Sequence, residues 1–244
     1  MTISMDCDIV KPENDTTLQV KRKMEEQNDG LDPKKSQLAR TQNGAAGKRV
    51  IVPACAPNLH YTPLKTALCY DVRMRYHAKI FTSYFEYIDP HPEDPRRIYR
   101  VYKILAENGL INDPTLSGID EIGDLMLKIP VREATDEEIL EVHSKENLEF
   151  VERSSRMKRE ELLKETEKGD SVYFNNDSYV SAKLSCGGVI DACKAVVEGR
   201  VKNALAVVRP PGHHAEPEAP GGFCLFSNVA VAAQNILKQY PESV

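Results

Sequence analysis

The stretch ALAVVRPPGHHAEPEAPGGFCLFSNVAVAA, residues 204–233, decides the fold class of this chain. It opens with a continuous apolar and partly β-branched run, residues 204–208, which is typical of a strand buried on both faces of a parallel sheet. A loop rich in proline and glycine follows. Ser227 or Asn228 can then cap a helix, which the apolar spacing extends through Leu237. A strand, a loop and a helix in this order predict an α/β fold, a parallel sheet flanked by helices.

The preceding residues repeat strand and helix signals. Residues 67–70 and 127–131 have strand character, and Leu184 to Gly199 reads as a helix. Asp94 and Pro95 open another helix, which is expected to end at Gly109. Its core-facing residues are expected to be Ile98, Val101, Tyr102 and Leu105. Thr135 and Glu138 match a capping box at the start of a further helix.

Composition divides the chain into two parts. Residues 1–65 are rich in charged and amide side chains and in prolines, which predicts a disordered tail and linker, while residues 66–244 have globular patterning. The tail carries basic clusters at residues 21–23 and 34–35 that import receptors could read, or that could simply solvate the tail. We expect the nucleus as the location, with the cytoplasm as the alternative.

Bulk properties exclude several classes of protein. The formal net charge of -5 gives no basic footprint, so we expect no direct nucleic-acid binding. No apolar run is as long as a membrane span. The six cysteines are scattered without CxxC spacing, which argues against a disulfide framework or a cysteine zinc site.

The loop places two adjacent histidines, His213 and His214, after two prolines and a glycine. Neighbouring imidazoles on irregular backbone can converge on one point, whereas on a strand they would face opposite ways. Because histidine exchanges protons near neutral pH, the pair could divide the proton transfers of a hydrolysis. On the pattern alone the pair could also be surface or structural histidines, or metal ligands. Gly222 and Phe223 set an aromatic ring beside bare backbone, which suits the wall of a narrow slot and equally suits a core position.

Residues 207–233 closely resemble the active-site segment of class II histone deacetylases. Residues 70–77, the HPE…R…I element at residues 91–98 and the helix ending in Val142-His143-Ser144 resemble the same family in the same order. The sequence of residues 78–97 and 198–208 is most similar to that of the fungal class II enzymes. The resemblance covers residues 50–244, about the first half of the family's catalytic domain. It implies a partial arginase/deacetylase-like fold whose C-terminal half is missing.

The resemblance implies roles for individual residues. His213 would hydrogen-bond the metal-bound water, and His214 would act as general base and then general acid. Phe223 and Gly222 would line the acetyl-lysine tunnel. Two further assignments concern Arg97, as the buried arginine near an internal cavity, and Ser171, as an acceptor from the substrate backbone.

The family's amide hydrolysis is zinc-dependent. It needs an Asp-x-His pair, a distant aspartate and an oxyanion-stabilising tyrosine or histidine. No aspartate follows the histidine loop, where the family would place its metal ligands, and no oxyanion residue is identifiable. We therefore expect no metal ligands in this chain, and no activity from the chain as written.

The implied function is deacetylation of acetyl-lysine on histones or other proteins, in chromatin and transcriptional repression, with corepressor proteins as further partners. The alternative is a non-catalytic truncated isoform or fragment that binds the partners of the parent deacetylase. Small acetylated amines and non-histone proteins such as tubulin are other candidate substrates.

Overall fold

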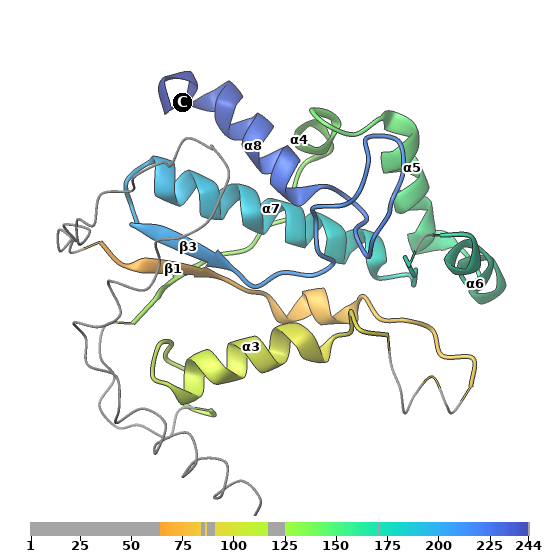
Figure 1. Cartoon of the computed structure of the whole chain (residues 1–244), viewed down its shortest axis with the longest axis horizontal. Helices are drawn as coiled ribbons and strands as arrows, with labels where there is room; N and C mark the ends of the chain where they lie inside the picture. The colour runs from red at the N-terminus through yellow and green to blue at the C-terminus, as the bar shows by residue number, and fades with distance from the viewer. Residues whose placement is uncertain (1–63, 84–85, 87–90, 117–124, 170, 244) are drawn as a thin grey trace, which may run out of the picture. The chain divides into compact units, whose positions relative to one another are not determined.

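The computed structural model describes residues 64–83, 86, 91–116, 125–169 and 171–243, all within one compact unit, Leu59–Val244. The expected tail and linker, residues 1–65, lie almost wholly outside the described residues. The described chain forms a three-stranded parallel sheet, in the order β2-β1-β3, with helices on both faces (Figure 1). The predicted α/β class is confirmed.

Strand β1, Thr66–Cys69, is the centre of the sheet. It pairs in parallel with β2, Leu127–Ile129, on one side and with β3, Asn203–Ala206, on the other. Successive β1 side chains face opposite ways. Leu68 therefore packs in one cluster with residues of α3, Arg96–Glu107, while its neighbours Ala67 and Cys69 pack with residues of α7.

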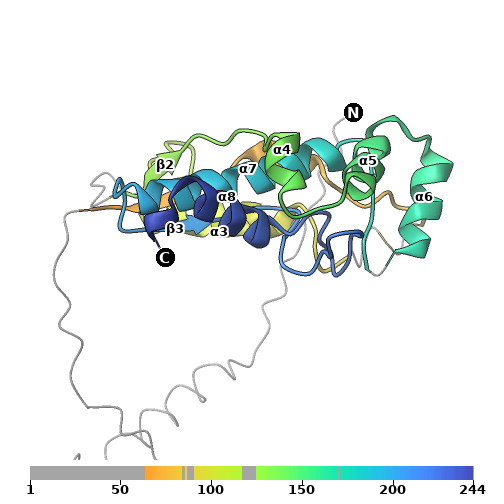
Figure 2. The same ribbon diagram turned by 90° about the horizontal axis from the view of Figure 1, so that it is seen from above.

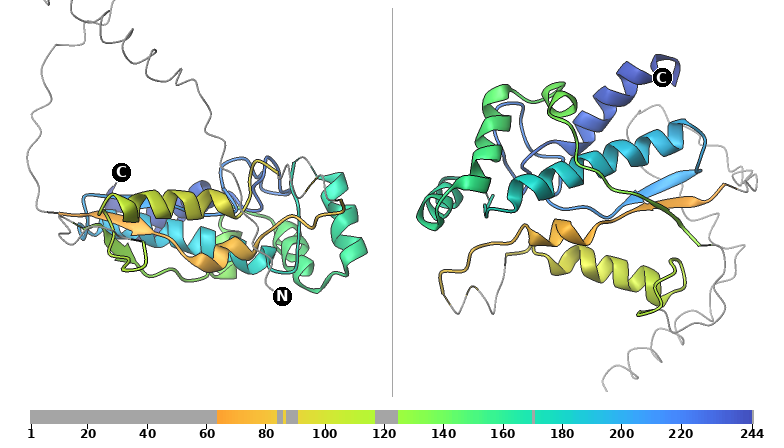
Figure 3. Two further views of the ribbon diagram at one scale, coloured as in Figure 1. Left: turned by 90° about the horizontal axis from the view of Figure 1, so that it is seen from below. Right: turned by 180° about the vertical axis from the view of Figure 1, so that it is seen from behind.

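Helix α3 covers one face of the sheet, and α7, Ser178–Val197, covers the other (Figures 1 and 3). Ile98 and Tyr102 of α3 are buried as predicted, but Val101 is 38% exposed. Val101 fits the helical period and nevertheless falls at the margin of the packed stripe. Gly109 follows the helix in a left-handed conformation (φ 69°), which ends the helix where the sequence indicated.

The remaining elements lie around this three-layer centre. Helix α8, Asn228–Gln239, packs on α7, and α4, α5 and α6 continue toward one end of the molecule (Figures 1 and 2). The bounds of the others are η1 Val72–Tyr76, α4 Asp136–Leu140, α5 Lys145–Arg153, η2 Ser154–Arg156, α6 Arg159–Lys168 and η3 Pro241–Ser243. The capping box predicted from Thr135 and Glu138 is present at α4.

The predicted burial of the strand in residues 204–208 is wrong. The strand forms, and it is parallel, but Leu205 is 40% exposed and the burial alternates along β3. Within the described residues β3 pairs with β1 alone, so one edge of it is uncovered. A continuous apolar run cannot tell a central strand from an edge strand, because both can carry the same residues.

None of the described helices is long and apolar enough to cross a bilayer. Over the same residues the cysteines are free thiols, namely Cys69, Cys186, Cys193 and Cys224. Cys7 and Cys55 fall outside the described residues.

Gly187 lies where α7 closely approaches the segment that precedes α4. A Cβ at Gly187 would lie 2.3 Å from the carbonyl oxygen of Arg132 and 2.6 Å from the backbone nitrogen of Ala134. Gly187→Ala should therefore lower the free energy of unfolding by about 2 kcal/mol, although alanine favours helix more than glycine does. Urea denaturation measures the change. Gly169→Ala is the matched control, because its Cβ would meet its nearest atom at 3.4 Å; equal stability of the two variants would refute the close approach.

Candidate active site

The two histidines lie on the loop that leaves the carboxyl end of β3. Their rings are close together, with centroids 4.2 Å apart and an interplanar angle of 66°. Both side chains are exposed. In parallel α/β sheets ligands bind at this edge, so the position suits a site that exchanges protons with a bound molecule.

The base of the loop is held by buried hydrogen bonds. The Ser185 hydroxyl donates to the carbonyl oxygen of Pro210 (2.7 Å), and the Asn228 side-chain amide donates to the same hydroxyl (2.7 Å). The Val229 N–H donates to the carbonyl oxygen of Gly212 (3.1 Å). A Cβ at Gly212 would lie 2.2 Å from Asn228 Cγ, so glycine is needed for this approach.

The far part of the loop is held by His143, which is buried between α4 and α5. Its Nε2 accepts from the Ser227 N–H at 2.8 Å, and its Nδ1 lies 3.2 Å from the Pro217 carbonyl oxygen. An Nε2 that accepts carries no proton, so Nδ1 is the donor and the ring is neutral. Burial lowers the pKa of His143, in agreement with that neutral form.

Gly222 and Phe223 form the turn that faces His214. Gly222 is left-handed (φ 51°), and a Cβ there would lie 2.8 Å from His214 Cβ. Beside them is a hollow of about 470 Å³, lined by His214, Glu216, Ala219, Pro220, Gly221 and Gly222. Phe223 is also left-handed (φ 70°), and its half-buried ring packs edge-on against His91, with centroids 4.9 Å apart. The structure therefore brings Gly222 beside His214 and turns the Phe223 ring toward the segment before α3.

Gly222→Ala should displace His214. The new methyl would meet the histidine side chain and would also be strained by the positive φ, so we expect a loss of about 1–3 kcal/mol and a shifted NMR signal from the His214 ring. Gly221→Ala is the control, since its Cβ would come no closer than 3.9 Å to the chain. An unchanged His214 signal in Gly222→Ala would contradict the described contact.

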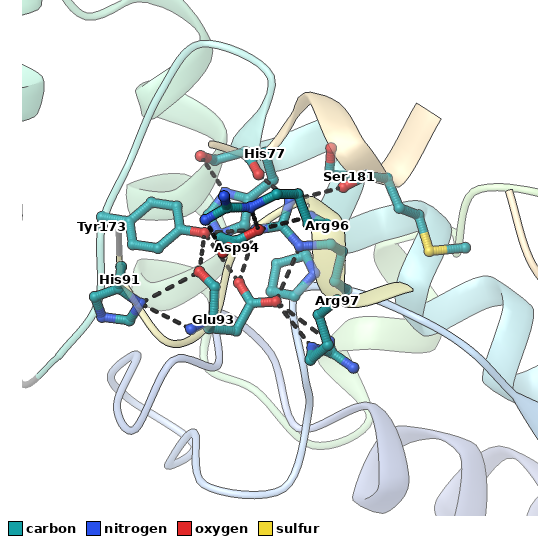
Figure 4. Close-up of polar contacts among 12 residues, drawn as sticks. His77, His91, Glu93, Asp94, Arg96, Arg97, Tyr173 and Ser181 are labelled. Atoms are coloured by element: carbon teal, nitrogen blue, oxygen red, sulfur yellow. Dashed lines mark hydrogen bonds and ion pairs between the residues drawn. The ribbon is translucent and has the colours of Figure 1, made fainter. Parts of the chain in front are cut away.

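Beneath the loop lies a buried ion pair between Arg209 and Glu93. Arg209 has no exposed surface; its Nε and Nη2 donate to the two Glu93 carboxylate oxygens at 2.9 and 2.8 Å. Its Nη1 donates to the carbonyl oxygens of Met74 and His77, and its Nη2 also donates to the Tyr173 hydroxyl. That hydroxyl donates in turn to the Glu93 carboxylate at 2.9 Å (Figure 4). The guanidinium is thus surrounded by acceptors, which is the condition for burying a charge.

The ion pair sets the charge states of its neighbours. Burial alone would raise the pKa of Glu93, but the hydrogen bonds and charge of Arg209 outweigh it and hold that pKa below its usual value. Burial, with the Arg209 charge, lowers the pKa of His77 to about 3. Burial and the Glu93 charge raise the pKa of the Tyr173 hydroxyl. At neutral pH the cluster therefore holds a carboxylate, a guanidinium, a neutral imidazole and a neutral phenol.

Aromatic contacts link this cluster to Phe223. His77 stacks on Tyr173 with centroids 4.5 Å apart, and His91 meets the edge of Tyr173 at 5.1 Å. His91 is also the ring that Phe223 contacts. Its Nδ1 accepts from the Glu93 N–H at 3.2 Å, so the aromatic chain and the ion pair share one segment (Figure 4).

The expected burial of Arg97 is wrong for the described chain. Its side chain is 40% exposed; it donates to the Glu93 carboxylate and, at 2.8 Å, to the Val208 carbonyl oxygen. The buried arginine is Arg209 instead, and its guanidinium donates to both Glu93 and Tyr173. Ser171 is exposed, with φ 58°, on the segment between α6 and α7. The roles predicted for Arg97 and Ser171 stay predictions.

His77 makes stability depend on pH. The unfolded chain binds a proton at His77 below about 6.5, while the folded chain resists protonation down to about 3. Stability should therefore fall as pH decreases through this window, by up to about 1.4 kcal/mol per pH unit from this group. Urea denaturation between pH 7 and pH 5 isolates the histidines, because Glu93 ionises lower. His77→Phe keeps an aromatic ring against Tyr173 and removes one of the two buried histidines, so the dependence of stability on pH should become less steep. A slope as steep as that of the unaltered chain would contradict the burial of His77.

The donor set does not suit a resident metal. Across the described segments there is no group of three or more histidine, cysteine, aspartate or glutamate side chains that could hold an ion. The rings of His77 and His91 both pack against Tyr173, and the Nδ1 atom of each ring already has a hydrogen-bond partner. We therefore assign zinc to no residue described here.

The ion pair and its neighbours had no strong sequence signal. Arg209 was visible as a charge ending an apolar run, and Tyr173 as a polar ring between Val172 and Phe174. Their role in the cluster depends on contact with Glu93, which is 116 residues from Arg209 in the sequence. No local spacing rule covers such a distance.

The family follows from comparison with known sequences. The sequence model of the histone deacetylase domain matches residues 91–243, so the chain belongs to the histone deacetylase family. Histone deacetylase HDA1 of Saccharomyces cerevisiae is 76% identical over 225 residues, which is 92% of this chain and 31% of that protein. HDA1 of Candida albicans is 68% identical, over 87% of this chain and 26% of its own length. The resemblance to fungal class II enzymes is thereby confirmed.

The fold comparison agrees. The crystal structure of the HDA15 HD domain is similar with a TM-score of 0.58 and 31% identity, over 72% of this chain and 44% of that one. The chain thus spans about a third or less of the length of the HDA1 relatives.

Proposed function

We propose that this chain supplies the proton-transfer part of a protein-lysine deacetylase site, with acetylated histones as the substrate class. The carrying observation is the converged pair His213–His214, fixed beside Gly222 on an anchored loop. The 76% identity to a histone deacetylase supports the substrate class. We further propose a nuclear location and corepressor partners, as for a chromatin regulator.

The chemistry of the pair follows from its setting. Hydrolysis of an acetyl-lysine amide needs a proton removed from water and one delivered to the leaving amine. Two exposed imidazoles with centroids 4.2 Å apart can share these transfers, with His214 as base and then acid and His213 as hydrogen-bonding partner of the water. In this family zinc polarises the amide and acidifies the water. The described residues contain no group of three or more side chains that could hold it, so we derive no step through it.

A second candidate is a non-catalytic protein that binds partners of a deacetylase. The absence of a metal-ligand group from the described residues favours it. Under this proposal the anchored loop would be a retained structural feature, and substitution of its histidines would leave partner binding intact.

A chimera tests the catalytic proposal. The matched 225-residue segment of Saccharomyces cerevisiae HDA1 is replaced by the corresponding segment of this chain. The chimera should deacetylate a histone peptide at a rate comparable with that of HDA1. In the chimera His214→Ala should lower kcat by about 10²–10⁴-fold, the usual contribution of a general acid–base. Glu218→Ala, an exposed change on the same loop, is the matched control.

The outcomes separate the two candidates. A chimera that folds and is inactive, or that is indifferent to His214→Ala, contradicts the catalytic proposal. The chain purified by itself is the second control. We expect no stoichiometric zinc and no turnover, and zinc with turnover would contradict our finding that the described residues do not suit the metal. Co-precipitation of corepressors by the chain and by its His213→Ala/His214→Ala variant would support the binding role.

A further inference from the structure

The buried ion pair joins the three segments that meet at the carboxyl edge of the sheet. Glu93 precedes α3, Tyr173 precedes α7 and Arg209 follows β3. These residues bond to one another rather than to neighbours in sequence, across separations of 80, 116 and 36 residues. The pair therefore fixes how these segments are spaced.

The geometry requires arginine and not only a positive charge. The guanidinium reaches both oxygens of one carboxylate, two backbone carbonyls and a phenol from a single plane. Lysine has the charge but no planar fork, so it cannot reproduce these contacts. An exposed pair nearby, Arg96–Asp94, has half of its arginine side chain in solvent and joins residues only two apart. It lacks the reach of the buried pair.

Both sides of the candidate site are tied to this pair. On one side, Arg209 is the residue from which the histidine loop departs, four residues before His213. On the other, Glu93 holds His91 through its backbone, and His91 packs on Phe223. Moving Glu93 relative to Arg209 would change the spacing of the histidines and the Phe223 turn.

We propose that Glu93 and Arg209 are positioning residues that hold the histidine loop and the His91–Phe223 contact in one fixed arrangement. This deepens the proposed function, in which that arrangement presents the proton-transfer pair to the substrate. Neither residue is assigned contact with the substrate.

Paired substitutions in the full chain separate positioning from plain stability. Glu93→Gln and Arg209→Lys each leave a buried group mismatched and should lower the unfolding midpoint. The double variant Glu93→Leu/Arg209→Met replaces the pair by apolar groups, a change that in other proteins is often neutral or stabilising. Hydrogen exchange then compares loop amides, those of Cys224 and Ser227, with amides inside α7. In the double variant we expect loop exchange to rise by about tenfold while α7 is unchanged.

Three outcomes decide the matter. Loop exchange raised in a stable double variant, with the NMR signals of the His213 and His214 rings shifted, supports positioning. Wild-type loop exchange and unshifted ring signals in that variant overturn it, because the pair would then be structural only. Arg96→Met is the matched control, and a rise in loop exchange there equal to that in the double variant would also overturn the proposal. If the double variant does not fold, Arg209→Lys decides by the same two readouts.

The exchange experiment does not depend on catalysis. An inactive chimera with raised loop exchange in the double variant would remove the proposed function and leave the positioning role. An active chimera whose kcat is unaffected by the double substitution would remove the positioning role and leave the function.

Discussion

Arg209 carries a charge in a position with no exposed surface, just beyond the end of β3. Removing a guanidinium from water costs several kcal/mol, and only a complete set of acceptors offsets this. Glu93, Tyr173 and the carbonyl oxygens of Met74 and His77 provide that set. Because the acceptors come from separate segments, the end of β3, the entry to α3 and the entry to α7 must be correctly placed together. The arrangement of the carboxyl edge depends on this one cation.

The parallel sheet is what makes such a convergence possible. With β1 between β2 and β3, every strand ends at the same edge, and the segments that follow β1 and β3 start side by side. The helix layers are brought close by small residues: Gly188 of α7 could not carry a Cβ without meeting Cys69 Sγ at 2.5 Å. Close approach of α7 in turn lets Ser185 reach Pro210 and fix the loop base. The geometry of the loop at the edge of the sheet thus depends on how closely α7 packs on the sheet.

Local rules predicted the local features. The Thr135 capping box, the end of α3 at Gly109 and the strand before the histidine loop each follow from a few adjacent residues, and each is present. The family resemblance likewise rested on a contiguous segment. What failed were statements about burial: Leu205 is exposed, and Arg209 rather than Arg97 is the buried arginine. Burial depends on which distant segments cover a residue, and the residues next to it in the sequence do not indicate which segments these are.

The histidines carry little of the stability of their own loop. Their rings are exposed, while the loop is held by Arg209, Asn228 and His143, which are buried. His213 contributes to the fold through its backbone N–H, which donates to Cys224 Sγ, and any residue but proline would supply that donor. The two imidazoles can therefore be replaced without unfolding the loop, whereas loss of an anchor would loosen it. Under the proposed function, this separation places the chemistry on exposed side chains and leaves the precision of their placement to buried groups.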